Sequence, residues 1–303
     1  MKSRYKCGEY ACKLPIYTER IELKMIEIPE TYVLAEQINK TLIGKKIIHA
    51  IAGAHPHSFA WFNGDPAAYA GMLTGQTIQS SNPGTGYTCG GNTEIVCDDF
   101  VVVISTPIKY HTPGAKLPKT HQLLLQFDDD SHMSCTVQMW GAMFCAPPSE
   151  IKNTGHFANS HLPDPLTDAF DEAYFEAIWK NAKPSLSAKA LLATEQRIPG
   201  LGNGVVQDIL YNAQIHPKRK LVSMQDSHME VLYKSVKSTI LAMKEGGGRD
   251  TERDLFNNYG NYKTILSKKT ISSPCIACGG ILIRQAFLGG NIYFCELCQP
   301  MEG

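Results

Sequence analysis

The chain has 303 residues, of which 43% are hydrophobic and 19% are charged, and its 29 basic side chains balance its 29 acidic ones. This composition is ordinary for a globular protein that can bury a sizeable core, and the length suggests two domains with a small appendix. The chain has no run of about 18 apolar residues and no apolar segment near its start, so we expect neither a transmembrane helix nor a secretory signal.

The first half of the chain predicts one helix followed by a β-sandwich. Residues 1–24 have no periodic pattern and form a predicted N-terminal extension. The stretch ETYVLAEQINKTLIG, residues 30–44, has apolar residues at helical spacing and a glycine stop, which predicts an amphipathic helix. Short β-rich runs bounded by turn residues follow: KKIIHAIAG, TIQSS, TEIVC, FVVVIS, HQLLLQF and CTVQMW. We therefore assign residues 25–148 to a β-sandwich domain.

The second half predicts helices and then a cysteine module. After a linker-like segment at residues 149–165, helical patterns occur in PLTDAFDEAYFEAIWKN from Pro165, in SLSAKALLATEQ after Pro184, from Gly204 to Ala213, and in SMQDSHMEVLYKSVKSTILAMKE. The first of these has a proline and acidic residues in its expected first turn, as a helix start should. Residues 165–265 are assigned to a helical domain and residues 266–303 to the cysteine module, so the fold class is α+β with several domains.

Two pairs of cysteines near the end of the chain have the spacing of a zinc site. Cys275 and Cys278 form one Cys-x2-Cys pair, and Cys295 and Cys298 form another after sixteen residues. Two such turns complete a tetrahedral four-sulfur site with no open position, which predicts one structural Zn²⁺. A redox dithiol or a chance cluster is the alternative. The other six cysteines share no spacing and are predicted to be inert thiols: Cys7, Cys12, Cys89, Cys97, Cys135 and Cys145.

The region around this module is locally basic. From Leu255 to Cys295 there is no Asp or Glu, while four lysines and arginines occur. Between the cysteine pairs, ILIRQAFLGGNIYF predicts a β-hairpin that turns at residues 289–291. A hairpin rich in donors suits a DNA backbone or groove, and scattered solvated charge is the alternative.

The stretch EQRIPGLGNGVVQDIL, residues 195–210, has a glycine-rich turn that opens a helix. Such a turn is a natural phosphate site, because the free N–H groups and the helix dipole point the same way. A dinucleotide site would need a strand before the glycines and an acidic residue about 20 positions later. Here a helix precedes, which favours a nucleic-acid phosphate. A simple helix–helix turn capped by Gly202 is the alternative.

Several stretches together resemble the formamidopyrimidine-DNA glycosylase and endonuclease VIII family. QRIPGLGNGVVQDILYNAQIHP resembles the helix–two-turn–helix motif of that family, and MIEIPE at residues 25–30 is similar to its N-terminal Pro-Glu-Leu-Pro-Glu. HQLLLQFDDDSHMSCTVQMWGA resembles the strand pair that ends in Arg-Arg-Phe-Gly, and the cysteine module resembles the C-terminal finger. The resemblance covers about residues 25–299 and implies a sandwich, a helical domain and a zinc finger with DNA in the cleft between domains.

The resemblance also implies roles for individual residues. Asn203 stands where the family contacts phosphates beside the lesion, with the N–H groups around Gly202, and Lys189 stands where the family has a basic residue facing the opened site. Glu27 matches the acidic residue that acts in proton transfer; a solvated acid at a helix start is the alternative. Met139 and Trp140 match the intercalating Arg and Phe, which predicts an apolar wedge, or else two core residues at a strand end.

The chain departs from the family at charged positions. Ile26 occupies the place of the N-terminal proline whose amine forms the Schiff base, and 25 residues precede it. Endonuclease VIII and its relatives also use a lysine in a β-hairpin of the sandwich, and the matching stretch here, YTCGGNTEIV, has no lysine. The position of the arginine in the family's zinc finger is occupied here by Gly290. An internal Ile26 amide is no nucleophile, so the family chemistry would need a free amine at Met25 or Ile26, or a lysine such as Lys24 or Lys189.

Three functions follow from these observations. The first is a base-excision DNA glycosylase and lyase with altered chemistry, the second is a non-catalytic binder of lesions or abasic sites, and the third is a zinc scaffold that no longer binds DNA. The expected partner is double-stranded DNA that is damaged or abasic. We expect a monomer with no membrane association, located in the cytoplasm with the nucleoid of a bacterium or in the nucleus of a eukaryote.

Overall fold

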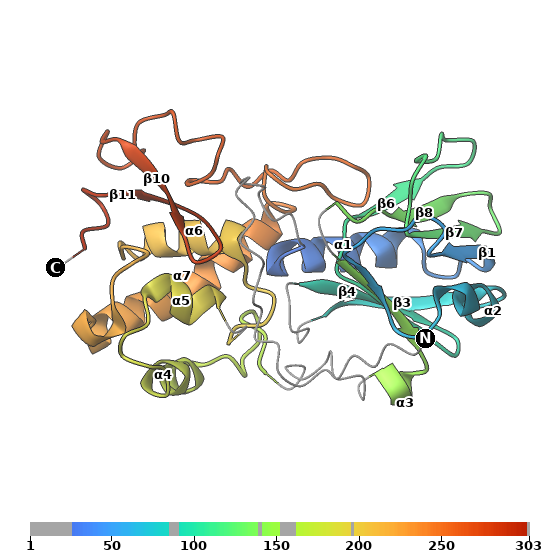
Figure 1. The fold of residues 1–303 in the computed structure, drawn as a ribbon, viewed down its shortest axis with the longest axis horizontal. Helices are drawn as coiled ribbons and strands as arrows, with labels where there is room; N and C mark the ends of the chain where they lie inside the picture. The colour runs from blue at the N-terminus through green and yellow to red at the C-terminus, as the bar shows by residue number, and fades with distance from the viewer. Residues whose placement is uncertain (1–25, 85–90, 139–140, 152–161, 195–196, 302–303) are drawn as a thin grey trace.

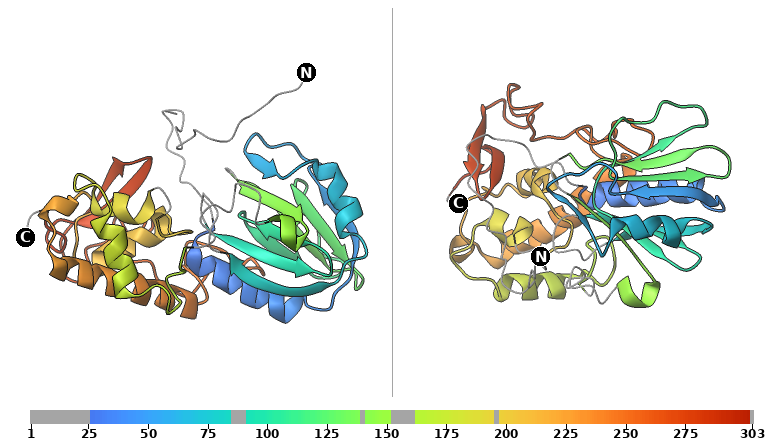
Figure 2. Two further views of the ribbon diagram at one scale, coloured as in Figure 1. Left: turned by 90° about the horizontal axis from the view of Figure 1, so that it is seen from below. Right: turned by 45° about the vertical axis from the view of Figure 1, so that its right-hand side comes forward.

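The computed structural model describes residues 26–84, 91–138, 141–151, 162–194 and 197–301. Two lobes lie side by side: a strand-rich lobe from the first half of the chain and a helical lobe from the second half, with helix α1 (Ile28–Thr41) reaching from one toward the other (Figure 1). The left view of Figure 2 shows the same two lobes side by side. No helix among the described residues is long and apolar enough to cross a membrane.

The strand-rich lobe is a sandwich of two sheets, as the sequence predicts. One sheet has the order β1-β7-β8-β6 and the other the order β2-β9-β5-β4-β3, and all pairs are antiparallel except β2 with β9. The strands are β1 (Ile47–Ala52), β2 (Ala60–Phe62), β3 (Ile78–Gly84), β4 (Asn92–Cys97), β5 (Val101–Ile104), β6 (Ile108–His111), β7 (Leu123–Phe127), β8 (His132–Cys135) and β9 (Gly141–Ala146). Short helices α2 (Tyr69–Leu73) and α3 (Pro148–Ile151) and the 3-10 turn η1 (Pro66–Ala68) complete the lobe.

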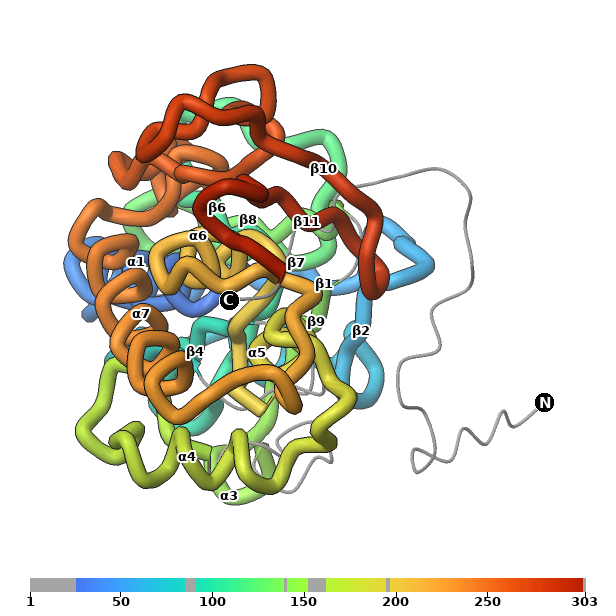
Figure 3. The backbone as a smooth tube through the Cα atoms, turned by 90° about the vertical axis from the view of Figure 1, so that its left-hand side faces the viewer, coloured from blue at the N-terminus to red at the C-terminus, as the bar shows by residue number. Residues whose placement is uncertain are grey.

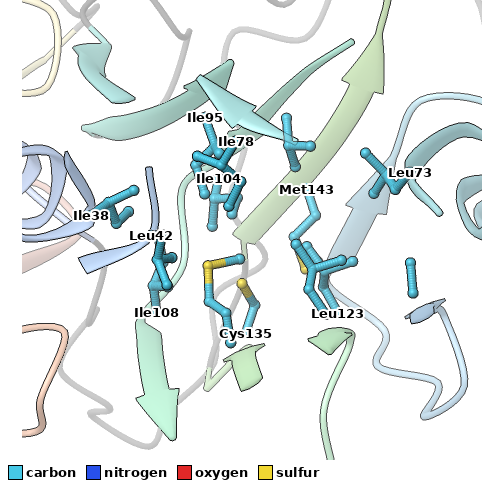
Figure 4. Close-up of a cluster of buried hydrophobic side chains, with 14 of the residues drawn as sticks. Ile38, Leu42, Leu73, Ile78, Ile95, Ile104, Ile108, Leu123, Cys135 and Met143 are labelled. Carbon is cyan, nitrogen blue, oxygen red and sulfur yellow. The ribbon is translucent and has the colours of Figure 1, made fainter. Parts of the chain in front are cut away.

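The core of the sandwich combines both sheets with α1. Side chains such as Ile95 and Ile104 meet Leu123 and Cys135 from the opposite sheet, and Ile38 of α1 packs beside them (Figure 4). The thiols of Cys97, Cys135 and Cys145 are buried in this lobe, as predicted. Cys7, Cys12 and Cys89 lie outside the described residues.

The helical lobe has its own core, and α1 enters it as well. Its helices are α4 (Glu172–Lys180), α5 (Ala188–Ala193), α6 (Asn203–Asn212) and α7 (Asp226–Glu245), with the 3-10 turn η3 (Leu221–Ser223). Ile28, at the start of α1, is fully buried among these helices. Because one end of α1 packs in each core, this helix fixes one lobe against the other.

One predicted helix start is wrong. The helix expected from Pro165 begins only at Glu172, because the Asp171 carboxylate accepts the Tyr174 N–H and caps the helix there. Asp164 instead accepts the Leu166 N–H and holds a separate turn. Two good capping residues lie seven positions apart, and the sequence pattern cannot decide between them.

The chain ends in the expected hairpin, β10 (Leu282–Phe287) and β11 (Gly290–Cys295), which packs over α6 (Figure 3). Its turn is at Leu288 and Gly289, which have φ of 49° and 73°. The sequence placed the turn one residue later, at residues 289–291. Gly290 and Asn291 instead belong to β11, and this places them against the helical lobe.

Candidate nucleic-acid interface

The glycine-rich turn before α6 is pressed against the sandwich lobe. The Gly200 carbonyl accepts the Ile28 N–H at 3.0 Å, and the Gly91 N–H donates to the Ile26 carbonyl at 2.8 Å. Ile26 is 6% exposed. The position that the family gives to its nucleophilic proline therefore lies next to the turn, although the two are about 175 residues apart in the chain.

Glu27 occupies the anion site that this turn creates. Its carboxylate accepts the N–H groups of Gly202 at 3.2 Å, Gly204 at 2.8 Å and Val205 at 2.9 Å. Free N–H groups at a helix start are ready donors to an anion, and here an acidic side chain of the same chain satisfies them. Glu27 is only 6% exposed, so it is not the solvated acid that the sequence left open.

Arg249 completes this buried cluster of charges. Its guanidinium donates to the Glu30 carboxylate through Nε at 2.9 Å and Nη2 at 2.8 Å, and its Nη1 lies 3.5 Å from Glu27 Oε1. A Cβ at position 204 would lie 1.8 Å from Arg249 Nη1, so only glycine at 204 lets the guanidinium approach the start of α6. The cluster joins α1, the turn and the segment that follows α7.

The side chain of Asn203, in contrast, takes no part in this network of charges and N–H groups. It is half-buried, and within the described ranges its side-chain amide makes no hydrogen bond. Gly290 of the hairpin lies against it, because a Cβ at position 290 would be 2.6 Å from Asn203 Nδ2. The arginine that the family has at this finger position is replaced by a residue that leaves room for Asn203.

A cleft of about 540 Å³ opens in front of these two residues. Its walls come from the turn, the hairpin and two segments that follow α7, at residues 249–259 and 264–269. Lys268 and Lys269 lie on this wall, and both are exposed. A second cavity of about 460 Å³ adjoins it at Thr251, Glu252 and Tyr259, and Ile26 lines that second cavity.

Lys189 lies away from bulk solvent. It is 1% exposed, and its Nζ donates to the carbonyl of Phe287 in the hairpin at 2.7 Å. Burial lowers the pKa of this amine to about 8. Lys189 therefore ties α5 to the hairpin, and the contact with phosphate expected for it stays a prediction.

The four cysteines of the module come together as a metal site. Their Sγ atoms all lie within 4.8 Å of one another, with 3.7 Å between Cys275 and Cys298 and 3.5 Å between Cys278 and Cys295. A tetrahedral Zn²⁺ with bonds of about 2.3 Å needs edges of roughly 3.8 Å. The residues therefore fit zinc, and this zinc would hold both turns of the module without an open position for chemistry.

The structure adds site residues that the sequence reading missed. Arg249 follows three glycines that predicted only a helix end, and no local pattern marks it as the partner of Glu27 and Glu30 at the start of α1. Gln207 and Tyr211 on α6 also contact the hairpin and went unnoticed among ordinary helical residues. Met139 and Trp140, the predicted wedge, lie outside the described residues and stay a prediction.

Comparisons with known proteins agree with this geometry. Residues 162–253 match the family model described as the formamidopyrimidine-DNA glycosylase H2TH domain. The formamidopyrimidine-DNA glycosylase of Enterococcus faecalis is 25% identical over 289 residues, covering 92% of this chain and 99% of the relative. The Bacillus subtilis protein of the same name is 26% identical over 293 residues, covering 92% of this chain and 100% of that relative.

Solved structures share the whole fold. A complex of Lactococcus lactis Fpg with abasic-site DNA aligns with a TM-score of 0.73 at 23% identity, covering 90% of this chain and 99% of that one. A second such complex gives a TM-score of 0.75 at 21% identity with the same coverage. These likenesses show that the two lobes and the four-cysteine module have the fold of the Lactococcus lactis Fpg structures. The chain is thus similar to formamidopyrimidine-DNA glycosylases over more than nine-tenths of its length, and its helical lobe matches their H2TH domain.

Proposed function

We propose that this protein binds damaged or abasic double-stranded DNA in the cleft in front of the glycine-rich turn and the hairpin. The observation that carries the proposal is Asn203, whose side-chain amide has no partner in the described part of the chain and which lines the 540 Å³ cleft. The Lactococcus lactis relatives are solved as complexes with abasic-site DNA, in keeping with this use of the cleft.

The charge on the cleft wall favours a phosphate backbone as the ligand. Lys268 is exposed, and Lys269 lies over the Tyr259 ring with its Nζ 4.7 Å from the centroid. Arg253 lies 4.1 Å from the same centroid. An exposed aromatic ring flanked by cations offers phosphate contacts and a stacking surface together. Because Glu27 fills the N–H groups of the turn, we assign the phosphate contact to Asn203 rather than to the Gly202 N–H.

The chemistry of the site depends on an amine. A Schiff base at a sugar carbon needs an uncharged amine, and the nitrogen of Ile26 in this sequence is a peptide amide. A chain that begins at Met25 or Ile26 would place an α-amino group next to the turn, with a pKa near 8 and a usable neutral fraction. We infer that the 303-residue form binds DNA without lyase chemistry, and that the shorter forms have at most weak activity.

One observation favours a non-catalytic binder as the second candidate. Proton transfer needs a carboxylate that can reach the substrate, whereas that of Glu27 already accepts three N–H groups and lies next to Arg249. In this arrangement Glu27 holds the turn in place.

Borohydride trapping on abasic-site DNA tests the chemistry, because reduction makes a Schiff base permanent. The 303-residue chain should give no trapped complex, and chains beginning at Met25 or Ile26 should give a weak one. Strong trapping by the longest form that disappears in Lys189→Ala would instead establish a lysine nucleophile. Binding of the same DNA without trapping by any form would favour the binder.

A further inference from the structure

One face of α6 contacts the hairpin β10–β11 and the four-cysteine module, which together are called the zinc hairpin here, from the start of the helix to its end. Asn203, Gln207 and Tyr211 follow one another at intervals of four residues, so their side chains lie on one side of the helix. Asn203 lies against Gly290, Gln207 bonds to β11, and Tyr211 reaches the metal site. The stripe therefore runs from the proposed phosphate contact to a metal ligand.

Gln207 pairs with β11 as a neighbouring strand would. Its Nε2 donates to the Asn291 carbonyl at 3.1 Å, and its Oε1 accepts the Tyr293 N–H at 3.1 Å. The carbonyl of one strand residue and the N–H of the second residue after it point to the same side, and β10 occupies the other side of β11. The side-chain amide thus satisfies the free edge of the hairpin.

The same amide also holds Asn203. Gln207 Nε2 donates to the Asn203 carbonyl at 2.8 Å, so one side chain bonds to both the turn and the hairpin. Gln207 is 2% exposed, which keeps water from competing for these bonds. A shift of the hairpin by one residue would break two of the three bonds, because the amide is bidentate.

Tyr211 fixes the other end of the contact. Its hydroxyl lies 3.0 Å from Cys275 Sγ and is buried. A hydroxyl that donates to a metal-bound thiolate orients that ligand, and such outer contacts strengthen metal binding. The zinc module and the start of α6 are in this way parts of one rigid contact.

We propose that Gln207 is a positioning residue that sets the zinc hairpin in register with Asn203. We propose further that Tyr211, at the other end of the same face of α6, holds the metal ligand Cys275 in place. Turn and hairpin then act as a single phosphate-binding surface. This inference rests on the proposed DNA binding for its functional consequence, but the register itself is a property of the protein alone.

The test compares Gln207→Met, which keeps the length of the side chain, with Gln122→Met. Gln122 is a matched control, since it is buried and its amide also joins a carbonyl and an N–H, those of His55 and Val137 in the sandwich lobe.

Gln207→Met should retain zinc while hydrogen exchange at the Tyr293 amide speeds up about tenfold or more. Its affinity for a duplex with a tetrahydrofuran abasic-site analogue should fall about tenfold, with a shallower salt dependence. Gln122→Met should change neither measurement.

Tyr211→Phe is tested separately against Tyr233→Phe, which loses a hydroxyl bond to the Phe170 carbonyl. Release of zinc to a chelator should be about tenfold faster in the first variant and unchanged in the second. Unchanged exchange at Tyr293 in Gln207→Met, or equal zinc release by the two tyrosine variants, would overturn the proposal. If the unmodified protein fails to bind the duplex, the proposed function is wrong, while the exchange and zinc-release measurements still decide the positioning roles.

Discussion

Glu30 and Arg249 form a doubly hydrogen-bonded ion pair that is almost wholly buried where the two lobes meet. Glu30 belongs to α1, whose ends pack in both cores, and Arg249 follows α7 at the start of a cleft wall. A second carboxylate-bearing residue, Glu27, links the pair to the turn before Asn203. The charges that hold the lobes together therefore also set the geometry of the proposed binding site.

Breaking this pair should be costly. Arg249→Met leaves two buried carboxylates without their cation, and removing one partner of a buried pair typically costs about 3–5 kcal/mol. The free energy of unfolding in urea should fall by that amount. Lys40→Met is the control, because its exposed pair with Glu36 should contribute less than about 1 kcal/mol. Equal losses in the two variants would show that the Arg249 cluster does not hold the lobes.

Restoring the family's finger arginine should weaken binding rather than strengthen it. In Gly290→Arg the new Cβ would lie 2.6 Å from Asn203 Nδ2, so the Asn203 side chain must move. The end of a side chain moves easily, and we expect little loss of stability but about tenfold weaker binding of abasic-site duplex by fluorescence anisotropy. Tighter binding of the variant would mean that Asn203 is not the main phosphate contact.

The four cysteines should bind one zinc ion that supplies folding energy. Metal analysis of the purified protein should give about one equivalent, and Cys278→Ser should lose zinc and unfold the module. Cys97→Ser is the control, since this buried thiol lies in the sandwich core, away from the cluster. A Cys278→Ser protein with full zinc content and unchanged folding would contradict the assignment.

Lys189 should make stability depend on pH. Burial lowers its pKa from 10.5 to about 8, so the folded protein binds fewer protons than the unfolded chain between these values. Below pH 8 the full cost of the buried charge is present, and stability rises as the pH increases from 8 to 10.5, by up to about 3 kcal/mol. Unfolding curves at pH 7.5 and pH 10 should show this gain relative to Lys189→Met.

Lys237 provides the control for that measurement. Its Nζ also donates to backbone carbonyls, those of Thr167 and Phe170, but it is only half-buried. Comparing Lys237→Met with the unmodified protein at the two pH values measures the effect of losing an amine that bonds to carbonyls without being buried. A Lys189→Met protein that behaves in the same way would show that the buried amine keeps its ordinary protonation.

Local patterns in the sequence predicted most of the elements of this fold. The apolar spacing of residues 30–44 indicated α1, the paired cysteines indicated the metal cluster, and the glycines at residues 200–204 indicated the turn. These features depend on neighbours in the chain, which a sequence pattern can express. The helix start at Glu172 was misplaced because two acidic caps compete nearby.

Contacts between distant segments could not be predicted in the same way. The turn was predicted to bind a phosphate of DNA through its N–H groups, but in this structure those groups bind the carboxylate of Glu27, which lies 175 positions before Gly202. Arg249 and Gln207 bond to residues of other segments, and neither has a local signature. Such partners follow from how the lobes pack, so only the structure reveals that the turn's N–H groups are filled and that the Asn203 amide has no hydrogen-bond partner among the described residues.

The most direct test of the account is the affinity of the protein for abasic-site duplex over a range of salt concentrations, with and without Asn203. Asn203→Ala should weaken binding about tenfold, equally for abasic and intact duplex, because phosphate contacts position rather than specify. Asn212→Ala, at the exposed far end of α6, should bind like the unmodified protein. The affinity of the unmodified protein should fall steeply with salt. Binding that is insensitive to salt, or that is the same in Asn203→Ala and Asn212→Ala, would contradict a phosphate site at this turn.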